Sequence, residues 1–184
     1  GLVRARRAAE LGQIKLNGSQ DTIPTFREVL EAVAGQVPIL VEIKDQDGAF
    51  GTNVGPLEEA VARDLQDYRG DCAVMSFNPH SVAVMQKMLP DVPRGITTDE
   101  HNPAPEGISA QELEDLRAIA AYERVGASFI SHDRKNLSSP RVTELKASGA
   151  RILCWTVRSP EQEVEARRVA ENITFEGYLP PKSA

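Results

Sequence analysis

The apolar residues of this chain follow two spacings that alternate along its length. Short apolar runs, bounded by turn residues, predict strands at 38–44, 72–77, 94–98, 127–132, 151–157 and 172–178. Segments with apolar residues three or four apart predict helices at 25–35, 56–68, 79–89, 109–125, 139–149 and 159–171. Strands that alternate with helices of about 10–15 residues are typical of parallel βαβ units, so the sequence predicts an α/β fold.

Residues at the predicted helix ends support these boundaries. Thr25 and Glu28 have the spacing of a capping box, and Gly35 follows as a helix stop. Asn78 precedes Pro79, which is the order expected of an N-cap and the first helical residue. Local signals and apolar periodicity therefore agree along the chain.

Six predicted strands fit an open, doubly wound sheet, whereas a closed (β/α)8 barrel needs eight. Neither glycine-rich phosphate loop of the nucleotide-binding open sheets is found in the sequence, which weakens the open-sheet interpretation. No low-complexity tract or linker divides the chain. We therefore expect residues 1–184 to form one domain.

Composition narrows the classes of partner. The hydrophobic fraction of 41% and the charged fraction of 26% are ordinary for a globular protein. A net charge of -6 argues against a nucleic-acid partner, because phosphate backbones need a concentrated basic face. The sequence contains no apolar run near 20 residues, so it predicts no membrane span.

The most apolar strand ends in two charged residues, Glu42 and Lys44. They are two positions apart, so their side chains share one face of the strand. A buried carboxylate needs a cation, a metal or a proton, and a lysine ammonium suits a phosphate. The pair could also bind only each other or neighbouring strands. The residues alone leave both interpretations open.

Other candidate site residues stand at the ends of other strands. Ser76 closes the second strand, and Asn78 follows it, where an N-cap is favoured over a ligand. His132 opens a loop, which is compatible with a solvated ring or a functional one. Trp155 suits either the core or the edge of a pocket, and Glu176 lies in the last predicted strand.

Four segments, taken in order, resemble one known family. They are IPTFREVL (23–30), LVEIK (40–44), VMSFNPHSV (74–82) and LCWTV (153–157). Their order and spacing are similar to those of the glycerophosphodiester phosphodiesterases, from about Asp21 onward. Each segment alone is a weak signal, but the ordered set is specific.

The resemblance implies a (β/α)8 TIM-type barrel with a small insertion after its second strand. It implies metal-dependent hydrolysis of glycerophosphodiesters to an alcohol and glycerol phosphate, a reaction of lipid metabolism, with Mg²⁺ or Ca²⁺ as the divalent cation. Glu42 matches the family's metal-ligand carboxylate, and Lys44 matches its phosphate-contacting lysine. Trp155 matches the tryptophan that edges the site.

The chain also departs from the family pattern. The family's H-R-G and E-L-D motifs and the H-D of its insertion are missing; in the family these motifs carry the catalytic histidines and two of the three protein metal ligands. We therefore expect a barrel lacking its first two strands, with residues 1–24 as a remnant of the insertion and 25–184 as βα units. The chain alone is expected to be inactive. Glu176 is the candidate for the place of the family's last aspartate.

Six strands of a barrel leave two unpaired edges, which invite pairing with other chains. We expect either a fragment of a longer protein, which we favour, or an oligomer that covers the edges. We also expect a cytoplasmic location. The alternative function is a non-catalytic, barrel-derived module that binds phosphate esters or a protein. A third is a phosphodiesterase of the same barrel type that acts on phospholipids.

Overall fold

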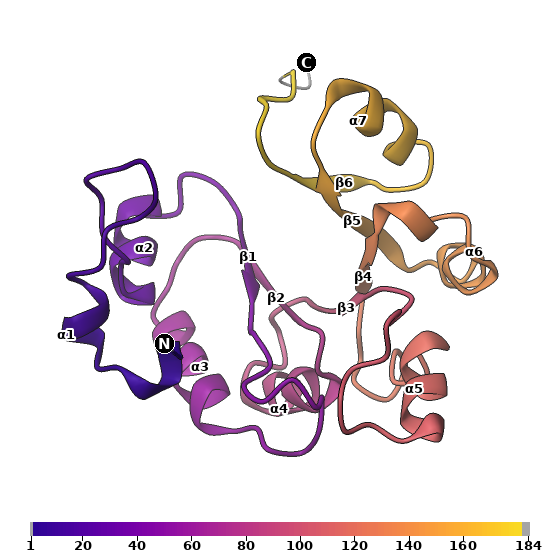
Figure 1. The fold of residues 1–184 in the computed structure, drawn as a ribbon, viewed down its shortest axis with the longest axis horizontal. Helices are drawn as coiled ribbons and strands as arrows, with labels where there is room; N and C mark the ends of the chain where they lie inside the picture. Colours follow the sequence, from indigo (N-terminus) through magenta and orange to yellow (C-terminus); the bar gives the residue numbers. More distant parts are fainter. Residues whose placement is uncertain (1, 182–184) are drawn as a thin grey trace.

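A computed structural model describes residues 2–181 of the chain. Its centre is a parallel sheet in the sequential order β1-β2-β3-β4-β5-β6, which curls into a half-barrel (Figure 1). The strands are β1 (Ile39–Glu42), β2 (Cys72–Ser76), β3 (Arg94–Thr98), β4 (Phe129–Asp133), β5 (Arg151–Val157) and β6 (Asn172–Phe175). The six predicted strands and the α/β class are confirmed.

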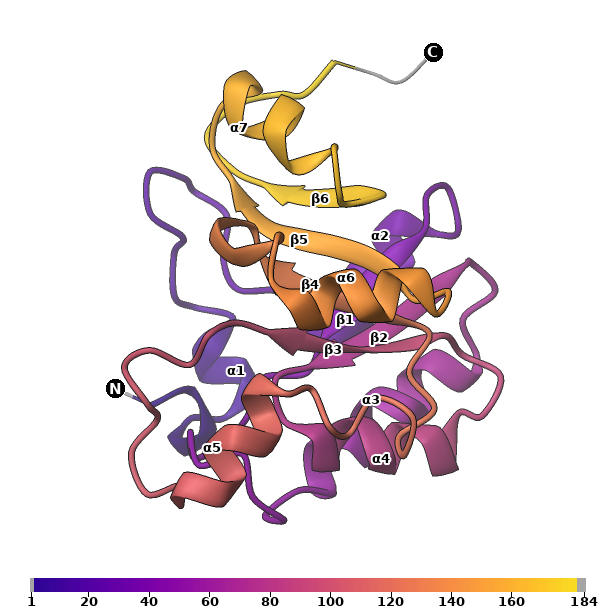
Figure 2. The same ribbon diagram turned by 90° about the vertical axis from the view of Figure 1, so that its right-hand side faces the viewer.

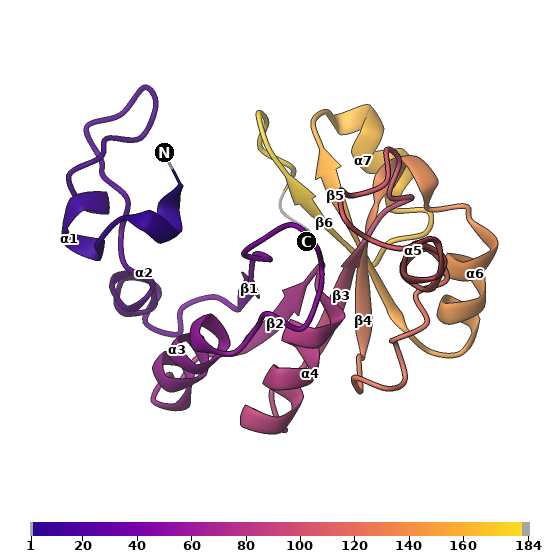
Figure 3. The ribbon, with the colours of Figure 1, turned by 60° about the horizontal axis from the view of Figure 1, so that its bottom comes forward.

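Helices connect successive strands and lie on one side of the curved sheet, as α3, α4 and α6 show (Figure 3). The α-helices are α1 (Ala8–Leu11), α2 (Phe26–Val33), α3 (Pro56–Gln66), α4 (Pro79–Met88), α5 (Ala110–Arg117), α6 (Pro140–Ala147) and α7 (Pro160–Ala166). The 3₁₀ turns are η1 (Val3–Ala5) and η2 (Arg134–Asn136). Between residues 2 and 181, no helix has the length and apolarity needed to cross a membrane.

The hydrophobic core lies between the sheet and these helices, in two clusters. One packs β1 and β2 against α2, α3 and α4, with Ile43, Val74 and Met85 among its members. The other packs β3, β4 and β5 against α6 and α7, with Ile130 and Ile152 at its centre. Because successive side chains on a strand point to opposite faces, the strand residues that alternate with these core residues face the concave side of the sheet.

On the concave face, Glu42 lies in register with Met75, and Met75 with Gly95. Gly95 is in turn in register with Phe129, whose ring lies directly over the glycine. A Cβ atom on Gly95 would come within 2.2 Å of this ring. The glycine is therefore needed for the close approach of Phe129 to the neighbouring strand.

The helix predicted at 109–125 is wrong in its second half. It ends at Arg117, and the chain then turns through Ile119, whose φ is 49°. The turn is closed by a hydrogen bond from the Ala120 amide to the Asp115 carbonyl at 3.0 Å, which is a Schellman pattern. Ile119 is buried in the larger core cluster, so burial of this side chain offsets the strained backbone.

Two predicted strands are also shorter than expected. β1 ends at Glu42, although the Ile43 amide still donates to the Met75 carbonyl at 2.8 Å. β6 ends at Phe175, ahead of a turn at Gly177, where φ is 79°. Strand pairing thus stops at the positions where the chain turns into a loop.

Within the described residues, β1 and β6 each have a strand neighbour on one side only (Figure 2). A cavity of about 440 Å³ opens at the amino ends of the strands, where Leu40, Ala73, Phe129 and Leu153 line it. Leu40, on the β1 edge, remains 37% exposed. Apolar surface and unpaired backbone groups are therefore exposed together at this edge.

Candidate active site

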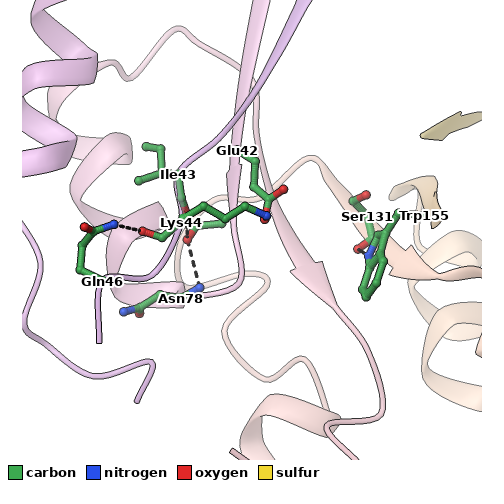
Figure 4. Close-up of polar contacts among 8 residues, drawn as sticks. Glu42, Ile43, Lys44, Gln46, Asn78, Ser131 and Trp155 are labelled. Atoms are coloured by element: carbon green, nitrogen blue, oxygen red, sulfur yellow. Dashed lines mark hydrogen bonds and ion pairs between the residues drawn. The ribbon is translucent and has the colours of Figure 1, made fainter. Parts of the chain in front are cut away.

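Glu42 and Lys44 bring opposite charges to the carboxyl end of β1. The Lys44 Nζ donates to the Glu42 Oε1 at 2.7 Å (Figure 4). The Lys44 side chain is 72% exposed and that of Glu42 is 24% exposed, so water reaches both groups. An exposed pair of this kind contributes about 0–1 kcal/mol to stability. Glu42 and Lys44 thus do pair with each other, but the pair is exposed and not buried, and two ammonium hydrogens remain for another partner.

Asn78 is fully buried and holds the loop that follows Lys44. Its Nδ2 donates to the Asp45 Oδ1 at 2.7 Å and to the Gly51 carbonyl at 2.9 Å. Its Oδ1 accepts from the His80 amide at 2.8 Å, which confirms the predicted N-cap of α4. Both hydrogens of Nδ2 and the Oδ1 thus have partners within the chain, so Asn78 shapes the site.

Ser76 is also buried, and its hydroxyl makes hydrogen bonds within the chain. Its hydroxyl donates to the Ile43 carbonyl at 2.6 Å and accepts from the Asn78 amide at 3.1 Å. These contacts fasten the end of β1 to the end of β2. Ser76 therefore supports the strand segment that carries Glu42 and Lys44.

An aromatic row links Lys44 to Trp155 across the carboxyl ends of the strands. Phe50 stacks with Phe77 at a centroid distance of 6.3 Å, and Phe77 meets Trp155 edge to face at 5.6 Å. One cavity of about 430 Å³ is lined by Lys44, Phe50 and Phe77, and we call it the Lys44 cavity. The Trp155 indole N–H donates to the Ser131 carbonyl at 3.0 Å, which fixes the ring (Figure 4). Glu42, Lys44 and Trp155 thus lie at the same end of the sheet.

The Lys44 cavity also contains a histidine–aspartate pair that the sequence did not reveal. The His101 Nδ1 lies 3.0 Å from the Asp99 Oδ1, and the His101 amide donates to the same oxygen at 2.7 Å. The hydrogen bond from the His101 ring lowers the pKa of Asp99, against the opposing effect of burial. The two residues are neighbours at a strand end, but only the loop conformation after β3 brings their side chains together.

His132 lies on the helix side of β4 and not in the Lys44 cavity. Its ring is buried, and its Nδ1 lies 2.7 Å from the Thr98 hydroxyl on β3. Burial lowers the pKa of His132, although Asp133 and Asp99 partly oppose this. The alternative of a solvated ring is therefore wrong.

Glu176 follows the end of β6 and binds a neighbouring arginine. Its carboxylate accepts from the Arg158 Nε at 2.6 Å, and its side chain is 59% exposed. Its amide donates to the Val157 carbonyl at 3.0 Å. Its partner is thus Arg158, a residue outside the lining of the Lys44 cavity.

Comparison with known families decides the assignment. The sequence model of the glycerophosphoryl diester phosphodiesterase family matches residues 2–172. The chain belongs to this family. The resemblance carried by the four segments is confirmed, and the enzyme class of the family is that of glycerophosphodiester hydrolysis.

Solved structures of the family share the fold. A phosphodiesterase from Oleispira antarctica, in complex with the product sn-glycerol-3-phosphate, matches with a TM-score of 0.74 and 18% identity, over 95% of this chain and 68% of that one. A putative glycerophosphodiester phosphodiesterase from Galdieria sulphuraria matches with a TM-score of 0.71 and 15% identity, over 92% and 66%. The chain thus spans about two thirds of these structures. Among curated proteins, none matches its sequence.

The family resemblance implies a divalent cation, which the described residues do not accommodate on their own. Across residues 2–181, no group of three or more His, Cys, Asp or Glu side chains lies close enough to hold a metal. Glu42 supplies one carboxylate, and one of its oxygens accepts from Lys44. Because Mg²⁺ and Ca²⁺ take six or more ligands, a cation at Glu42 would need ligands from beyond this set.

Proposed function

We propose that residues 1–184 form the last six strands of a glycerophosphodiester phosphodiesterase barrel. The first two strands, with the H-R-G and E-L-D motifs, would come from outside this sequence. The complete protein would hydrolyse glycerophosphodiesters to an alcohol and glycerol phosphate. The observation that carries the proposal is the place of Lys44 and Glu42, which stand at the carboxyl end of β1 beside an aromatic-lined cavity.

In this proposal Lys44 binds the phosphate. Its ammonium is held by one hydrogen bond to Glu42, and its other two hydrogens point away from that bond and can meet phosphate oxygens. A positive charge fixed there favours the extra negative charge that develops as the phosphodiester is attacked. Glu42 would orient Lys44 and offer its second oxygen to Mg²⁺ or Ca²⁺, together with ligands from outside the chain.

The aromatic row would contact the carbon atoms of the substrate. Phe50, Phe77 and Trp155 form a wall that excludes water from one side of the phosphate position. The wall gives no hydrogen bond that selects one alcohol, so the head group would be chosen elsewhere in the complete barrel.

Proton transfer is assigned to histidines outside residues 1–184. Loss of one general acid or base typically lowers the rate by about 10²–10⁴-fold. We therefore expect the isolated chain to lack measurable turnover. The second candidate, a module that binds phosphate esters without turnover, has the same Lys44 cavity but no catalytic histidines in the complete protein.

The test is the conversion of glycerophosphocholine by the complete gene product in the presence of Mg²⁺ or Ca²⁺. Phosphorus NMR separates the phosphodiester signal from the phosphomonoester signal, so turnover is read directly. We expect conversion by the complete protein and none by residues 1–184 alone. Turnover by the isolated chain at the same rate would show that its own residues carry the chemistry. Binding of glycerol phosphate without turnover of any glycerophosphodiester by the complete protein would establish the binding module instead.

A further inference from the structure

The loop that follows β3 forms one wall of the Lys44 cavity. Asp99, His101 and Pro103 of this loop line the cavity, together with Lys44 and Phe50. Among the residues that the structure describes, His101 is the one histidine in this lining. The wall therefore brings a carboxylate and an imidazole to the cavity in which Lys44 provides the positive charge.

Contacts from three directions hold His101 in this wall. Arg117 donates from Nη2 to the His101 carbonyl at 3.2 Å and from Nε to the Glu100 carbonyl at 2.9 Å. The His101 amide donates to the Asp99 Oδ1 at 2.7 Å, and the ring meets Phe50 edge to face at a centroid distance of 5.7 Å. The φ angle of His101 is 47°, a left-handed conformation that persists only where surrounding contacts maintain it. The ring is thus positioned without a ligand.

The contact between His101 and Asp99 determines which ring nitrogen carries the hydrogen. The His101 Nδ1 lies 3.0 Å from the Asp99 Oδ1. The interaction with the ring lowers the pKa of Asp99, so this carboxylate is ionised and can only accept a hydrogen bond. In the neutral ring the hydrogen therefore lies on Nδ1, and Nε2 presents a lone pair.

Two hydrogen-bond acceptors in this wall have no partner. Within residues 2–181, no hydrogen bond or ion pair uses the His101 Nε2 or the Asp99 Oδ2. The Asp99 side chain is 30% exposed, and the His101 Nε2, unlike the Nε2 of His132, is not fully enclosed by protein atoms. Because the two side chains are in contact, neighbouring groups of one ligand can reach both acceptors. Such a ligand must donate hydrogens, as hydroxyl and ammonium groups do.

Charge fixes the orientation of a ligand that also carries a phosphate. The phosphate is attracted by Lys44 and repelled by the Asp99 carboxylate, so the other end of the ligand turns toward Asp99 and His101. Glycerol phosphate has two hydroxyls on adjacent carbons at that end. We propose that His101 and Asp99 accept hydrogen bonds from the glycerol hydroxyls while Lys44 binds the phosphate, so that this pair selects the glycerol moiety. The inference rests on the proposed phosphate position at Lys44.

Three ligands with the same phosphate group test the selection. They are glycerol 3-phosphate, propyl phosphate, which has no hydroxyl, and phosphoethanolamine, which has an ammonium group instead. Their affinities for the complete gene product are measured by titration calorimetry. We expect glycerol 3-phosphate to bind at least about tenfold more tightly than propyl phosphate, as one or two additional hydrogen bonds predict.

Variants of the wall should change this preference and nothing else. His101→Phe keeps an aromatic ring beside Phe50 but has no acceptor, and Asp99→Asn removes the carboxylate charge. Each should weaken the binding of glycerol 3-phosphate about tenfold and leave propyl phosphate unchanged, which would also show that the cavity is intact. Lys44→Met should weaken both ligands by the same factor. Glu100→Gln, an exposed position of the same loop outside the cavity lining, is the matched control and should change neither affinity.

Rescue by a conservative variant separates hydrogen bonding from packing. His101→Gln has an acceptor oxygen but no ring, so it should recover part of the glycerol preference that His101→Phe loses. If the pair only supported the loop, His101→Gln would be no better than His101→Phe, and both would weaken propyl phosphate as well.

Two results would overturn the proposal while the proposed function stands. One is equal affinity of the wild type for glycerol 3-phosphate and propyl phosphate, or a preference that survives both His101→Phe and Asp99→Asn. The other is a loss confined to phosphoethanolamine, which would assign the two acceptors to a cationic head group. A wild type that binds none of the three ligands would overturn the phosphate position at Lys44 as well. Turnover of glycerophosphocholine by the same preparation reports the proposed function separately, so the two failures are distinguishable.

Discussion

At the scale of single residues, exposure decides how the Glu42–Lys44 pair should be understood. Sequence alone could not separate a buried ion pair from a binding site, since both place opposite charges two residues apart. The structure exposes most of the Lys44 side chain, so the pair adds little to stability and remains free to bind a ligand.

Substitution of either partner should therefore leave stability nearly unchanged. Glu42→Gln and Lys44→Met should each change the free energy of unfolding by less than about 1 kcal/mol, as measured by urea denaturation. In the complete protein, Glu42→Gln should weaken metal binding, while Lys44→Met should not. Losses of about 3–5 kcal/mol in both variants, with unchanged metal affinity, would restore the buried-pair interpretation.

The lowered pKa of His132 predicts that the stability of the chain depends on pH. Its pKa is lowered in the folded chain by burial, whereas the unfolded value is about 6.5. The unfolded chain therefore binds more protons than the folded chain as the pH falls below about 6.5. The free energy of unfolding should decline through this window, down to the folded pKa.

Replacement of the ring tests this assignment. His132→Gln should remove that part of the decline between neutral and mildly acidic pH, measured by urea denaturation at each pH. Gln13→Ala, an exposed position without a titratable group, is the control and should keep the wild-type slope. An identical slope in His132→Gln would assign the decline to other groups.

At the scale of elements, the sheet depends on the contact between β3 and β4. Gly95→Ala should lower the free energy of unfolding by about 1–3 kcal/mol or more, because the new Cβ atom would lie 2.2 Å from the Phe129 ring. Gly51→Ala is the matched control, since nothing lies within 4 Å of its Cβ position, and should change stability by less than about 0.5 kcal/mol. Equal effects of both substitutions would contradict the packing of Phe129 over Gly95.

Elements with strong local signals were predictable, and tertiary contacts explain the rest. The Thr25 capping box and the Asn78 N-cap follow from side chains that bond to nearby amides, so the sequence contains the full information. The end of α5 does not, because Ile119 leaves the helix to bury its side chain in the core. From apolar spacing alone, Ile119 is predicted to be one more residue of the helix.

At the scale of the whole molecule, the half-barrel brings the candidate site residues to one end of the sheet, but a cation at Glu42 would need further ligands. Strand order could be predicted from the βαβ alternation, and the common end of Glu42 and Trp155 follows from parallel strands. The aromatic row and the Asp99–His101 pair could not, because they depend on the conformations of the loops that follow β1, β2 and β3. The edges of β1 and β6 are where the proposed additional strands would pair.

The central claim is that Lys44 holds the phosphate of the substrate, and the turnover of glycerophosphocholine by Lys44→Met in the complete protein tests it most directly. Loss of one preorganised charge at the reacting group predicts a fall in kcat of about 10²–10³-fold. Lys87→Met, on the exposed side of α4, should keep the wild-type rate. Wild-type turnover by Lys44→Met would contradict the assignment of Lys44 to the phosphate.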